Sequence, residues 1–541
     1  MATSSSDTSH KLQHDVSGAT TTGVDHLIPI RGPEHISYEV GPWAQKTILT
    51  FDGGGIRGYA SLLVLKRIMN RIRELETQHN DPAHKSSYYR WIGVPDDDAV
   101  EGEPDPKRVD RYLPCHYFDY IAGTSTGGLS SIMLGRLRMS VDQALDTYKS
   151  FGNAVFGKPR RFHELSLSYW PRAKYSCRQT REAYKKIIYD TLQRERECDP
   201  SEVETEQLKY REDRTRTIAI SWAINKKTGV NKEFVWRSYA NDFRPKENDP
   251  TRCIPSNAGP AHRSAIWKVA RATTAAPGYF EAIKLMGMKF IDGGVVANNP
   301  SLIALREIHN LHDQVPALFV SIGTGLKDSS DARNNTNGAT KNANGGSRMF
   351  KKTATTDDVR HKQGLKKYRE IGKHLKNRII DCEGSNGTEG WRDWCRAIGM
   401  REHLYRLNVK GDLHTVSLDE WRPSNTGEGT LSFIEAETDK YLAERSVINY
   451  INSIAEKAVE IRRERAATEH WERFAVDVTY TCPDCQTRKY DTRAQLREHL
   501  QQGIEHRENQ VPDKGMLEKI LNTSRTFRTN RSEEPGDDGV M

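Results

Sequence analysis

Twice along this chain, a short apolar strand pattern runs into a glycine-rich turn that opens an amphipathic helix. The first copy has its strand at 46–51, and the apolar residues of its helix recur every three or four positions over 62–75. The second copy has its strand at 117–122 and its helix at 129–137. Apolar strands that alternate with amphipathic helices predict an α/β sheet that is mainly parallel and covered by helices. Further strand candidates are 217–224, 234–239, 289–291 and 317–322.

The chain is longer than one hydrophobic core usually fills, since it has 541 residues. Its mean hydropathy of −0.75 is low, so we expect a folded core accompanied by long polar segments. A single charged helix is expected over 433–466. The expected parts are a disordered leader at 1–43, a main α/β domain at 44–325, a disordered insertion at 326–358, a helical continuation of the main domain at 359–467, a small separate module at 478–507 and a disordered tail at 508–541.

Cysteines and targeting signals favour a cytoplasmic protein. The first 43 residues hold no apolar stretch that could serve as a secretory signal, and no window approaches 18 consecutive apolar residues. The eight cysteines are therefore expected to be reduced thiols. The formal net charge of +8 suits an anionic partner, and a dispersed, solvated surface is the alternative.

The glycine cluster after the first strand, GGGIRG at 53–58, leaves three uses open. Its backbone N–H groups could hold a pyrophosphate, as in dinucleotide-binding turns, or stabilise the oxyanion of an acyl-transfer transition state. Asp52 would repel a pyrophosphate, and no strand that ends in an acidic residue follows at the required distance. The oxyanion use is therefore favoured over the dinucleotide site. A tight turn that needs glycine only for its backbone angles is the third alternative.

The second turn, GTSTGG at 123–128, has the G-x-S-x-G pattern of a nucleophile elbow. Gly123 and Gly127 would permit the sharp turn, and Ser125 would stand at a helix N-terminus, where developing negative charge is favoured. Ser125 is therefore the candidate nucleophile. The alternative is a serine that only caps its helix.

A base for this serine is less obvious from the sequence. His262, His309 and His312 lie downstream, but none follows a strand in a motif that would present it. Asp292 directly follows the strand at 289–291, where open α/β sheets build their sites. An ordinary aspartate is a poor base, so burial would have to raise its pKa. A turn-forming Asp-Gly pair is the alternative.

Taken together, these motifs resemble those of the patatin-like phospholipase family. The matching segments are DGGGIRG at 52–58, GTSTG at 123–127, ATTAAPGYF at 272–280, DGG at 292–294 and NNP at 298–300. The resemblance covers roughly 46–325. It extends less distinctly over 400–450, where YRLNV at 405–409 and DEW at 419–421 look like fungal or plant-type members.

The resemblance implies a patatin-type three-layer sandwich with a Ser–Asp dyad, in which Ser125 is the nucleophile and Asp292 the base. The residues that match the family's oxyanion-hole segment are Gly53, Gly54, Gly55 and Arg57. The supporting motif glycines are Gly123, Gly127, Gly293 and Gly294.

The resemblance also implies an activity. The family hydrolyses fatty acyl esters of phospholipids and related lipids without calcium, so we expect a phospholipase A or lysophospholipase that needs no cofactor for catalysis. The mixed basic and aromatic stretch at 158–175 predicts peripheral contact with a membrane surface, and a packed loop with snorkelling arginines is the alternative.

The module at 478–507 has the residue order of a two-Cys, two-His zinc finger. Its candidate ligands for a structural zinc ion are Cys482, Cys485, His499 and His506. Thirteen residues separate Cys485 from His499 and six separate His499 from His506, and both spacings exceed the usual values. A degenerate, metal-free finger is the alternative, and a protein partner is the expected use of the module.

Two functions of different classes follow from these motifs. The first is a lipid acyl hydrolase. The second is an interaction or nucleic-acid-binding protein that carries the zinc finger on a catalytically silent patatin scaffold. The three intact catalytic elements favour the hydrolase over a finger with two irregular spacings.

Overall fold

The computed structural model describes residues 41–78, 87, 112–161, 172–195, 198–225, 227–229, 231–241, 256–326, 383, 387–468, 470–476, 478–483, 489–490, 492–502 and 514–527. Nearly all of the expected leader and the insertion at 326–358 lie outside these residues.

The described residues form a sheet of eight strands, in which five neighbouring strands run parallel in the order β3-β2-β1-β7-β8. Their bounds are β1 Thr47–Phe51, β2 Tyr120–Thr124, β3 Arg216–Ile224, β7 Leu318–Ile322 and β8 Leu404–Leu407. Every residue of β1, β2 and β7 is buried. Such continuous apolar strands suit the middle of a sheet that is covered on both faces.

Three further strands extend this sheet with antiparallel pairing. They are β4 Asn231–Arg237, β5 Ile283–Leu285 and β6 Met288–Asp292. One edge of β3 pairs with β4. The other edge of β3 is shared by β2 and β6. On that edge β2 pairs with β3 as far as Ile220, and β6 pairs with it from Ser221 onward. The C-terminal ends of β2 and β6 therefore meet on one edge of β3.

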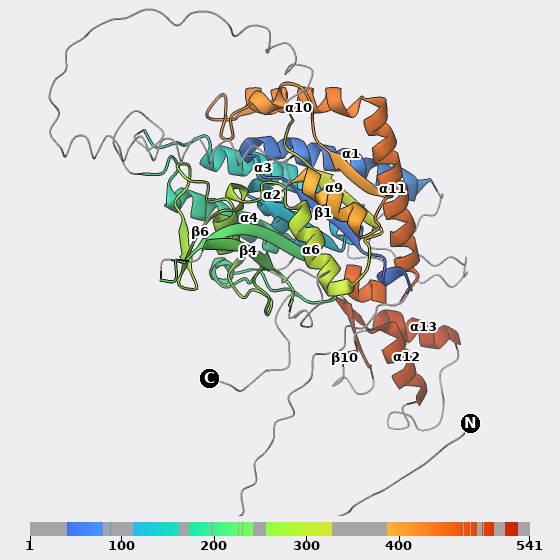
Figure 1. Cartoon of the computed structure of the whole chain (residues 1–541). Coiled ribbons are helices and arrows are strands. Elements are labelled where there is room, and N and C mark those ends of the chain that lie inside the picture. Colours follow the sequence, from blue (N-terminus) through green and yellow to red (C-terminus); the bar gives the residue numbers. More distant parts are fainter. Residues whose placement is uncertain are drawn as a thin grey trace, which may run out of the picture. The chain divides into compact units, whose positions relative to one another are not determined.

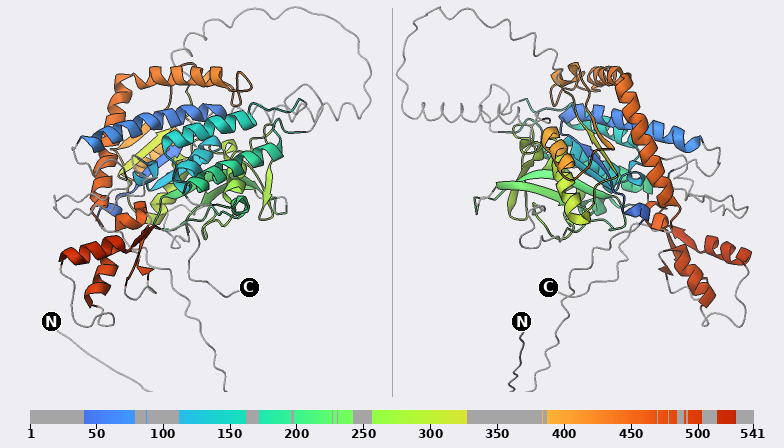
Figure 2. Two further views of the ribbon diagram at one scale, coloured as in Figure 1. Left: turned by 180° about the vertical axis from the view of Figure 1, so that it is seen from behind. Right: turned by 45° about the vertical axis from the view of Figure 1, so that its right-hand side comes forward.

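Helices cover both faces of the sheet, so the predicted three-layer α/β sandwich is confirmed (Figures 1 and 2). Alternate strand residues feed two cores: Leu49 packs with one group of helices and Ile48 with the other. The first group includes α1 Gly58–Thr77, α3 Val141–Val155, α4 Cys177–Glu195, α5 Ile266–Thr273, α10 Glu428–Leu442 and α11 Arg445–Ala466. The second comprises α6 Ser301–His312 and α9 Thr388–Ala397.

The expected helical continuation at 359–467 needs two corrections. It contributes β8, which pairs in parallel with β7 and so belongs to the central sheet. The single helix expected at 433–466 is two helices, since α10 ends at Leu442 and α11 begins at Arg445. Glu444 adopts an extended backbone between them, which breaks the helix.

The C-terminal module is also larger than predicted. Its sheet has the order β10-β9-β11, and its helices are α12 and α13. The bounds are β9 Val478–Thr481, β10 Lys489–Tyr490, α12 Arg493–Gln502, α13 Lys514–Thr523 and β11 Arg525–Phe527. The expectation of a disordered tail from 508 is therefore wrong for α13 and β11, because Leu517 and Leu521 bury themselves in the core of the module. The last residues of the expected leader, Gly41–Trp43, form a 3-10 turn, and the Trp43 ring packs near Trp471.

Candidate active site

Ser125 and Asp292 are brought together where β2 and β6 meet. Thr124, the last residue of β2, pairs with Ile220, and Asp292, the last residue of β6, pairs with Ser221. The Ser125 hydroxyl donates a hydrogen bond to Asp292 Oδ2 at 2.6 Å. Both residues are buried, and Asp292 is 0% exposed.

The backbone at Ser125 has the strained geometry of a strand-to-helix elbow. Its φ of 56° and ψ of −126° are rare for a residue with a side chain. A Cβ atom at Gly123 would overlap the Gly127 carbonyl, and one at Gly127 would overlap the Phe51 and Asp52 carbonyls, so larger residues do not fit. The Ser125 side chain does not cap α2 (Thr126–Ser131), which excludes the capping alternative.

Thr273, at the end of α5, supports the backbone of the elbow through its hydroxyl group. Its hydroxyl accepts a hydrogen bond from the Ser125 N–H at 3.1 Å and donates one to the Ile220 carbonyl at 2.6 Å. The Ile220 carbonyl lies where β2 stops pairing with β3. The hydroxyl of Thr273 therefore connects Ser125 to the edge of β3 at which β2 and β6 meet.

Burial raises the pKa of Asp292 to about 7, although hydrogen bonds from Ser125 and the Gly294 N–H act in the opposite direction. The Gly294 N–H donates to Asp292 Oδ1 at 2.7 Å. Asp292 thus forms the Asp-Gly turn and also faces the serine, so the two alternatives for this residue coexist. With a pKa near 7, this carboxyl group can exchange a proton at neutral pH, which an ordinary aspartate cannot do efficiently.

The glycine loop between β1 and α1 lies beside the dyad, and its N–H groups are not equivalent. The Gly53 N–H donates to the Asn298 carbonyl at 3.0 Å, and the Arg57 N–H donates to the Gly54 carbonyl at 3.2 Å. The Gly54 N–H has only a 3.4 Å contact with the Thr126 hydroxyl. Within the described part of the chain, the Gly55 N–H makes no hydrogen bond. Of the four matching residues, only Gly54 and Gly55 thus have backbone donors that a ligand could use.

Two other features of the loop bear on the alternatives left open by the sequence. Gly55 has a φ of 57°, so this turn does require glycine for its backbone angle. The Leu418 carbonyl also packs against Gly55 and accepts the Ile56 N–H at 2.8 Å. The Arg57 guanidinium is 2% exposed and donates to the His414 carbonyl, so it points into the protein.

An aromatic pocket of about 30 Å³ opens onto Ser125 and Asp292. Its apolar wall comes mainly from Phe151, Phe156, Tyr184, Tyr279, Phe280 and Leu418. Sequence reasoning gave no role to Leu418 or Asp419, which close the pocket from a segment far along the chain. The Asp419 carboxylate accepts the Tyr175 hydroxyl at 2.6 Å and forms an ion pair with Lys174.

The three candidate histidines lie elsewhere. His262 Nδ1 accepts the Arg237 N–H at 3.0 Å, and burial lowers the pKa of His262 to about 4. His312 Nε2 contacts the Tyr120 hydroxyl at 2.6 Å, and burial lowers its pKa to about 3. His309 packs against Trp394. Ser125 and Asp292 hydrogen-bond to each other and to no described histidine.

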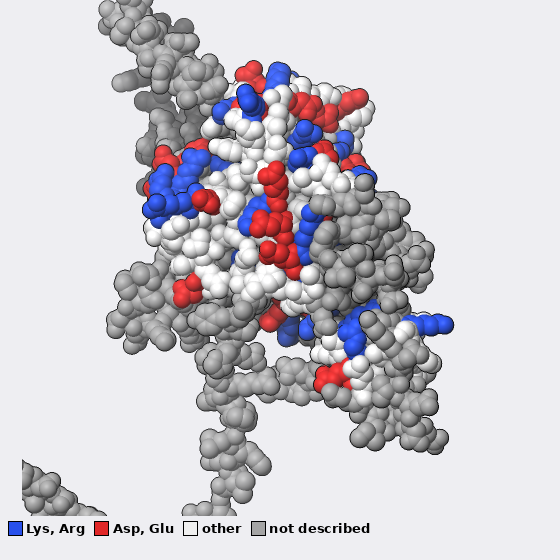
Figure 3. Space-filling model, turned by 90° about the vertical axis from the view of Figure 1, so that its right-hand side faces the viewer, with Lys and Arg blue, Asp and Glu red and all other residues white. Residues whose placement is uncertain are grey.

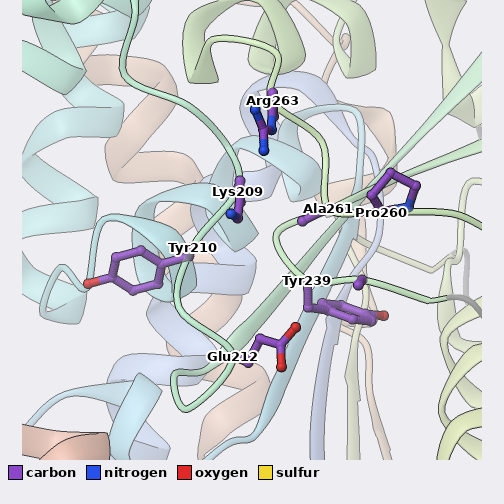
Figure 4. Close-up of a pocket in the computed structure, with 8 residues that line it drawn as sticks. Lys209, Tyr210, Glu212, Tyr239, Pro260, Ala261 and Arg263 are labelled. Atoms are coloured by element: carbon purple, nitrogen blue, oxygen red, sulfur yellow. The ribbon is translucent and has the colours of Figure 1, made fainter. Parts of the chain in front are cut away.

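A larger hollow, of about 180 Å³, lies near the start of β3. Its lining includes Lys209, Tyr210, Glu212, Tyr239 and Arg263 (Figure 4). None of its lining residues is a serine, threonine or cysteine that could act as a nucleophile. The smaller pocket is therefore the candidate active site despite its size.

The structure tests the zinc site only in part. Cys482 is buried, and His499 lies on α12 with its ring 5.0 Å from that of Tyr490. Cys485 and His506 lie outside the described residues. The described residues contain no group of three or more histidine, cysteine or acidic side chains placed to hold a metal ion. The zinc site therefore stays a prediction.

The described surface and helices give two general constraints. On the face shown in Figure 3, basic and acidic side chains are interspersed, which fits the dispersed alternative for the net charge. Among the residues that the structure describes, no helix combines the length and apolar character needed to span a membrane.

Known proteins resemble this chain over its main domain. Residues 49–305 match the family model described as "Patatin-like phospholipase". Calcium-independent phospholipase A2-gamma of Oryctolagus cuniculus is 27% identical over 290 residues, which are 53% of this chain and 29% of that protein. Phospholipase A I of Arabidopsis thaliana is 24% identical over 51% of this chain and 20% of its own length. Patatin-like protein 1 of Oryza sativa is 24% identical over 52% of this chain and 59% of its own length.

This chain thus spans less than a third of the first two relatives. Because the relatives come from mammals and plants, they leave the fungal or plant type of the chain a prediction. The solved structure of VipD from Legionella pneumophila aligns with 85% of this chain and 76% of that chain, at 11% identity and a TM-score of 0.27, too low to establish a shared fold. The sheet, the elbow and the family match agree on one domain. Residues 49–305 of this chain form a patatin-like phospholipase domain that is homologous to calcium-independent phospholipase A2-gamma and to plant phospholipase A.

Proposed function

We propose that this protein is a calcium-independent lipid acyl hydrolase of the phospholipase A or lysophospholipase type. The observation that carries the proposal is the 2.6 Å hydrogen bond from the Ser125 hydroxyl to Asp292, at the base of an aromatic pocket. The relatives named as phospholipases support a lipid ester as the substrate. The apolar wall of the pocket suits an acyl chain better than a polar substrate.

In the acylation step, ionised Asp292 accepts the Ser125 proton as Oγ attacks the acyl carbonyl carbon. The raised pKa of Asp292 supports this role, because a base works best when its pKa lies near the working pH. The tetrahedral intermediate then collapses, the ester C–O bond breaks, and the leaving alcohol or lysophospholipid takes the proton from Asp292. Ser125 is left acylated.

The oxyanion would be held by the Gly54 and Gly55 N–H groups, since the Gly53 and Arg57 N–H groups are already engaged within the protein. Removal of one such donor from an acyl-transfer site typically costs about 10²–10³-fold in kcat. In the deacylation step, Asp292 accepts a proton from water as the water oxygen attacks the acyl carbonyl carbon. The bond between that carbon and Ser125 Oγ then breaks, the fatty acid leaves, and Oγ takes the proton from Asp292. Nucleophile, base and oxyanion donors thus come from the chain, and the proposal includes no catalytic cofactor.

The test is hydrolysis of phosphatidylcholine vesicles with a calcium chelator present, combined with fluorophosphonate labelling of Ser125. Wild type should release fatty acid and become labelled, whereas Ser125→Ala and Asp292→Asn should lose activity by about 10³-fold or more. Ser446→Ala, an exposed serine on α11, is the matched control and should behave as wild type. Equal fatty-acid release by wild type and Ser125→Ala would refute the proposed function.

A lipid substrate implies work at a membrane surface, so we also propose a cytoplasmic protein that binds membranes peripherally. Lys158, Arg161 and Arg172 are exposed and flank residues 162–171, which are not described. These cations suit anionic headgroups. The zinc-finger protein on a silent scaffold remains the weaker alternative, because an intact dyad supports catalysis. A structural zinc ion and a protein partner for the C-terminal module are kept as proposals.

A further inference from the structure

Arg406, a residue of β8 outside the family-matched region, forms a two-pronged ion pair with Asp52 directly behind the glycine loop. Arg406 Nη1 donates to Asp52 Oδ1 at 2.9 Å, and Nη2 donates to Oδ2 at 2.6 Å. The side chains of Asp52 and Arg406 are 0% and 4% exposed. The same guanidinium donates to the Ser321 hydroxyl at 2.9 Å and to Glu383 at 2.8 Å. Burial alone would raise the pKa of Glu383, but the charge of Arg406 keeps it lowered.

Asp52 is the last residue before the loop, so its orientation sets the direction in which the loop leaves the sheet. The Asp52 N–H donates to the Ile322 carbonyl at 3.0 Å, which extends the β1–β7 pairing by one residue. The next carbonyl, that of Gly53, accepts the Asn298 amide at 3.0 Å and the Thr324 hydroxyl at 2.9 Å. The Arg406 pair is thus one side of a clamp whose other side is Asn298 and Thr324.

A charged pair in this position is better suited to fixing geometry than to adding stability. Buried ion pairs often contribute no more to stability than well-packed apolar residues of similar size. A bidentate arginine–carboxylate pair, however, fixes both the distance and the plane of the carboxylate. The Gly54 and Gly55 N–H groups lie two and three residues beyond Asp52 in the chain.

We propose that Arg406 is a positioning residue for acyl transfer, and that its pairing with Asp52 aims the Gly54 and Gly55 N–H groups at the oxyanion. The inference rests on the proposed lipid acyl hydrolysis. It assigns a role in the reaction to β8, which lies about 100 residues beyond the family-matched region. Arg406 touches no reacting atom and acts only through Asp52 and the loop.

The main test is the double variant Asp52→Asn:Arg406→Met, which removes both charges of the pair, although Glu383 and Ser321 also lose their bonds to Arg406. Kinetics would be measured with a soluble p-nitrophenyl butyrate substrate, and stability by urea unfolding. We expect a loss of stability, because Glu383 and Ser321 lose a partner, together with a kcat lowered by about 10²-fold and little change in KM. The midpoint of the pH profile should not move, because Asp292 is untouched. Unchanged kcat in a folded double variant would overturn the inference.

Arg406→Lys provides a second, milder variant that keeps the positive charge but cannot form the bidentate pair with the Asp52 carboxylate. We expect its kcat to fall by about 10-fold, and wild-type kcat here would also overturn the inference. The matched control is Arg237→Met:Glu307→Gln, which alters a buried pair of similar exposure, at 0% and 3%, on β4 and α6. It should lose stability and keep kcat. A comparable loss of kcat in the control would assign the effect to general destabilisation.

Failure of the proposed function gives a different result. If wild type neither hydrolyses the ester nor accepts fluorophosphonate at Ser125, acyl transfer itself is wrong and the positioning role falls with it. If wild type is active and both Arg406 variants match it, only the positioning role is wrong.

Discussion

Ser125 and Asp292 meet because the strands that carry them run toward each other along one edge of β3. β2 ends where β3 reaches Ile220, and β6 ends one residue further on, at Ser221. The two side chains therefore face each other across a junction that the sheet itself defines.

The first prediction concerns the pH dependence of activity. Only the ionised form of Asp292 can accept the Ser125 proton. Because burial raises the pKa of Asp292 to about 7, this form becomes the major one above that pH. We expect kcat/KM to rise with pH and to reach half of its plateau near pH 7. The measurement is a pH profile with a soluble ester. A plateau that already extends down to pH 5 would indicate a base with an ordinary pKa.

The second prediction concerns stability, and the same pKa gives its sign. In the unfolded chain Asp292 titrates near 3.9, so between about pH 4 and 7 the folded protein holds a proton that the unfolded chain does not. The contribution of protonated Asp292 is thus fully present below about pH 4 and is lost as pH rises through 7. We expect Asp292→Asn to unfold at higher urea than wild type at pH 8, by a few kcal/mol, and this gap to shrink toward pH 5.

The matched control for that comparison is Asp142→Asn, which alters an exposed carboxylate paired with Lys66. Its difference from wild type should stay below about 1 kcal/mol at both pH values. A gap for Asp292→Asn that is equal at pH 5 and pH 8 would contradict the raised pKa.

The motifs were enough to predict that Ser125 and Asp292 pair, but not which residues hold them in place. Ser125 and Asp292 each lie in a short glycine-flanked turn at a strand end, and such turns have a local signature. Thr273, Arg406 and Asp419 act across the fold, at positions where local sequence carries no sign of the contact. The resemblance marked the segments that contain these three residues but gave them no role.

The sequence also failed to predict β5, β8 and α13, because their local patterns are too short or too interrupted. β5 has three residues and β8 has four, too few for a pattern of alternation to be distinguished from a loop. β8 also carries Arg406, whose charge interrupts the apolar pattern of a strand that is mostly half-buried. α13 has apolar residues at helical spacing but is only ten residues long, too short to be stable without its packing against the small C-terminal core.

The third prediction separates the dyad from a histidine mechanism. His262→Asn, His309→Asn and His312→Asn should each retain fluorophosphonate labelling of Ser125 and ester hydrolysis. His312→Asn should lose about 1–3 kcal/mol of stability, because the Tyr120 hydroxyl loses a buried partner. The measurements are labelling rate and urea unfolding for each variant. Loss of labelling in any folded variant would identify a histidine as the base.

The fourth prediction concerns Thr273. Thr273→Val keeps the shape of the side chain but removes the hydroxyl that accepts the Ser125 N–H. We expect a loss of stability of about 1–3 kcal/mol and a slower labelling of Ser125, because the Ser125 N–H loses its hydrogen-bond acceptor. Thr438→Val is the control: Thr438 is equally buried on α10, and its hydroxyl donates to the Ile434 carbonyl of the same helix. Similar labelling rates for the two variants would mean that Thr273 has no special role.

The last prediction concerns access to the pocket. A cavity of about 30 Å³ holds about one water molecule, so an acyl chain can enter only if part of the wall moves. Leu418 and Asp419 form one part of this wall. The Asp419 carboxylate attaches it to the rest of the pocket through its contacts with Tyr175 and Lys174. Asp419→Asn keeps the volume and removes the charge that holds Lys174. It should raise kcat/KM several-fold for long-chain esters and leave acetate esters nearly unchanged, because a short acyl group needs less opening. Asp190→Asn, which alters an exposed pair with Lys186, is the control and should change neither rate. A longer acyl chain needs a wider opening of the wall than acetate does. Equal effects of Asp419→Asn on long-chain and acetate esters would therefore show that Asp419 does not control entry.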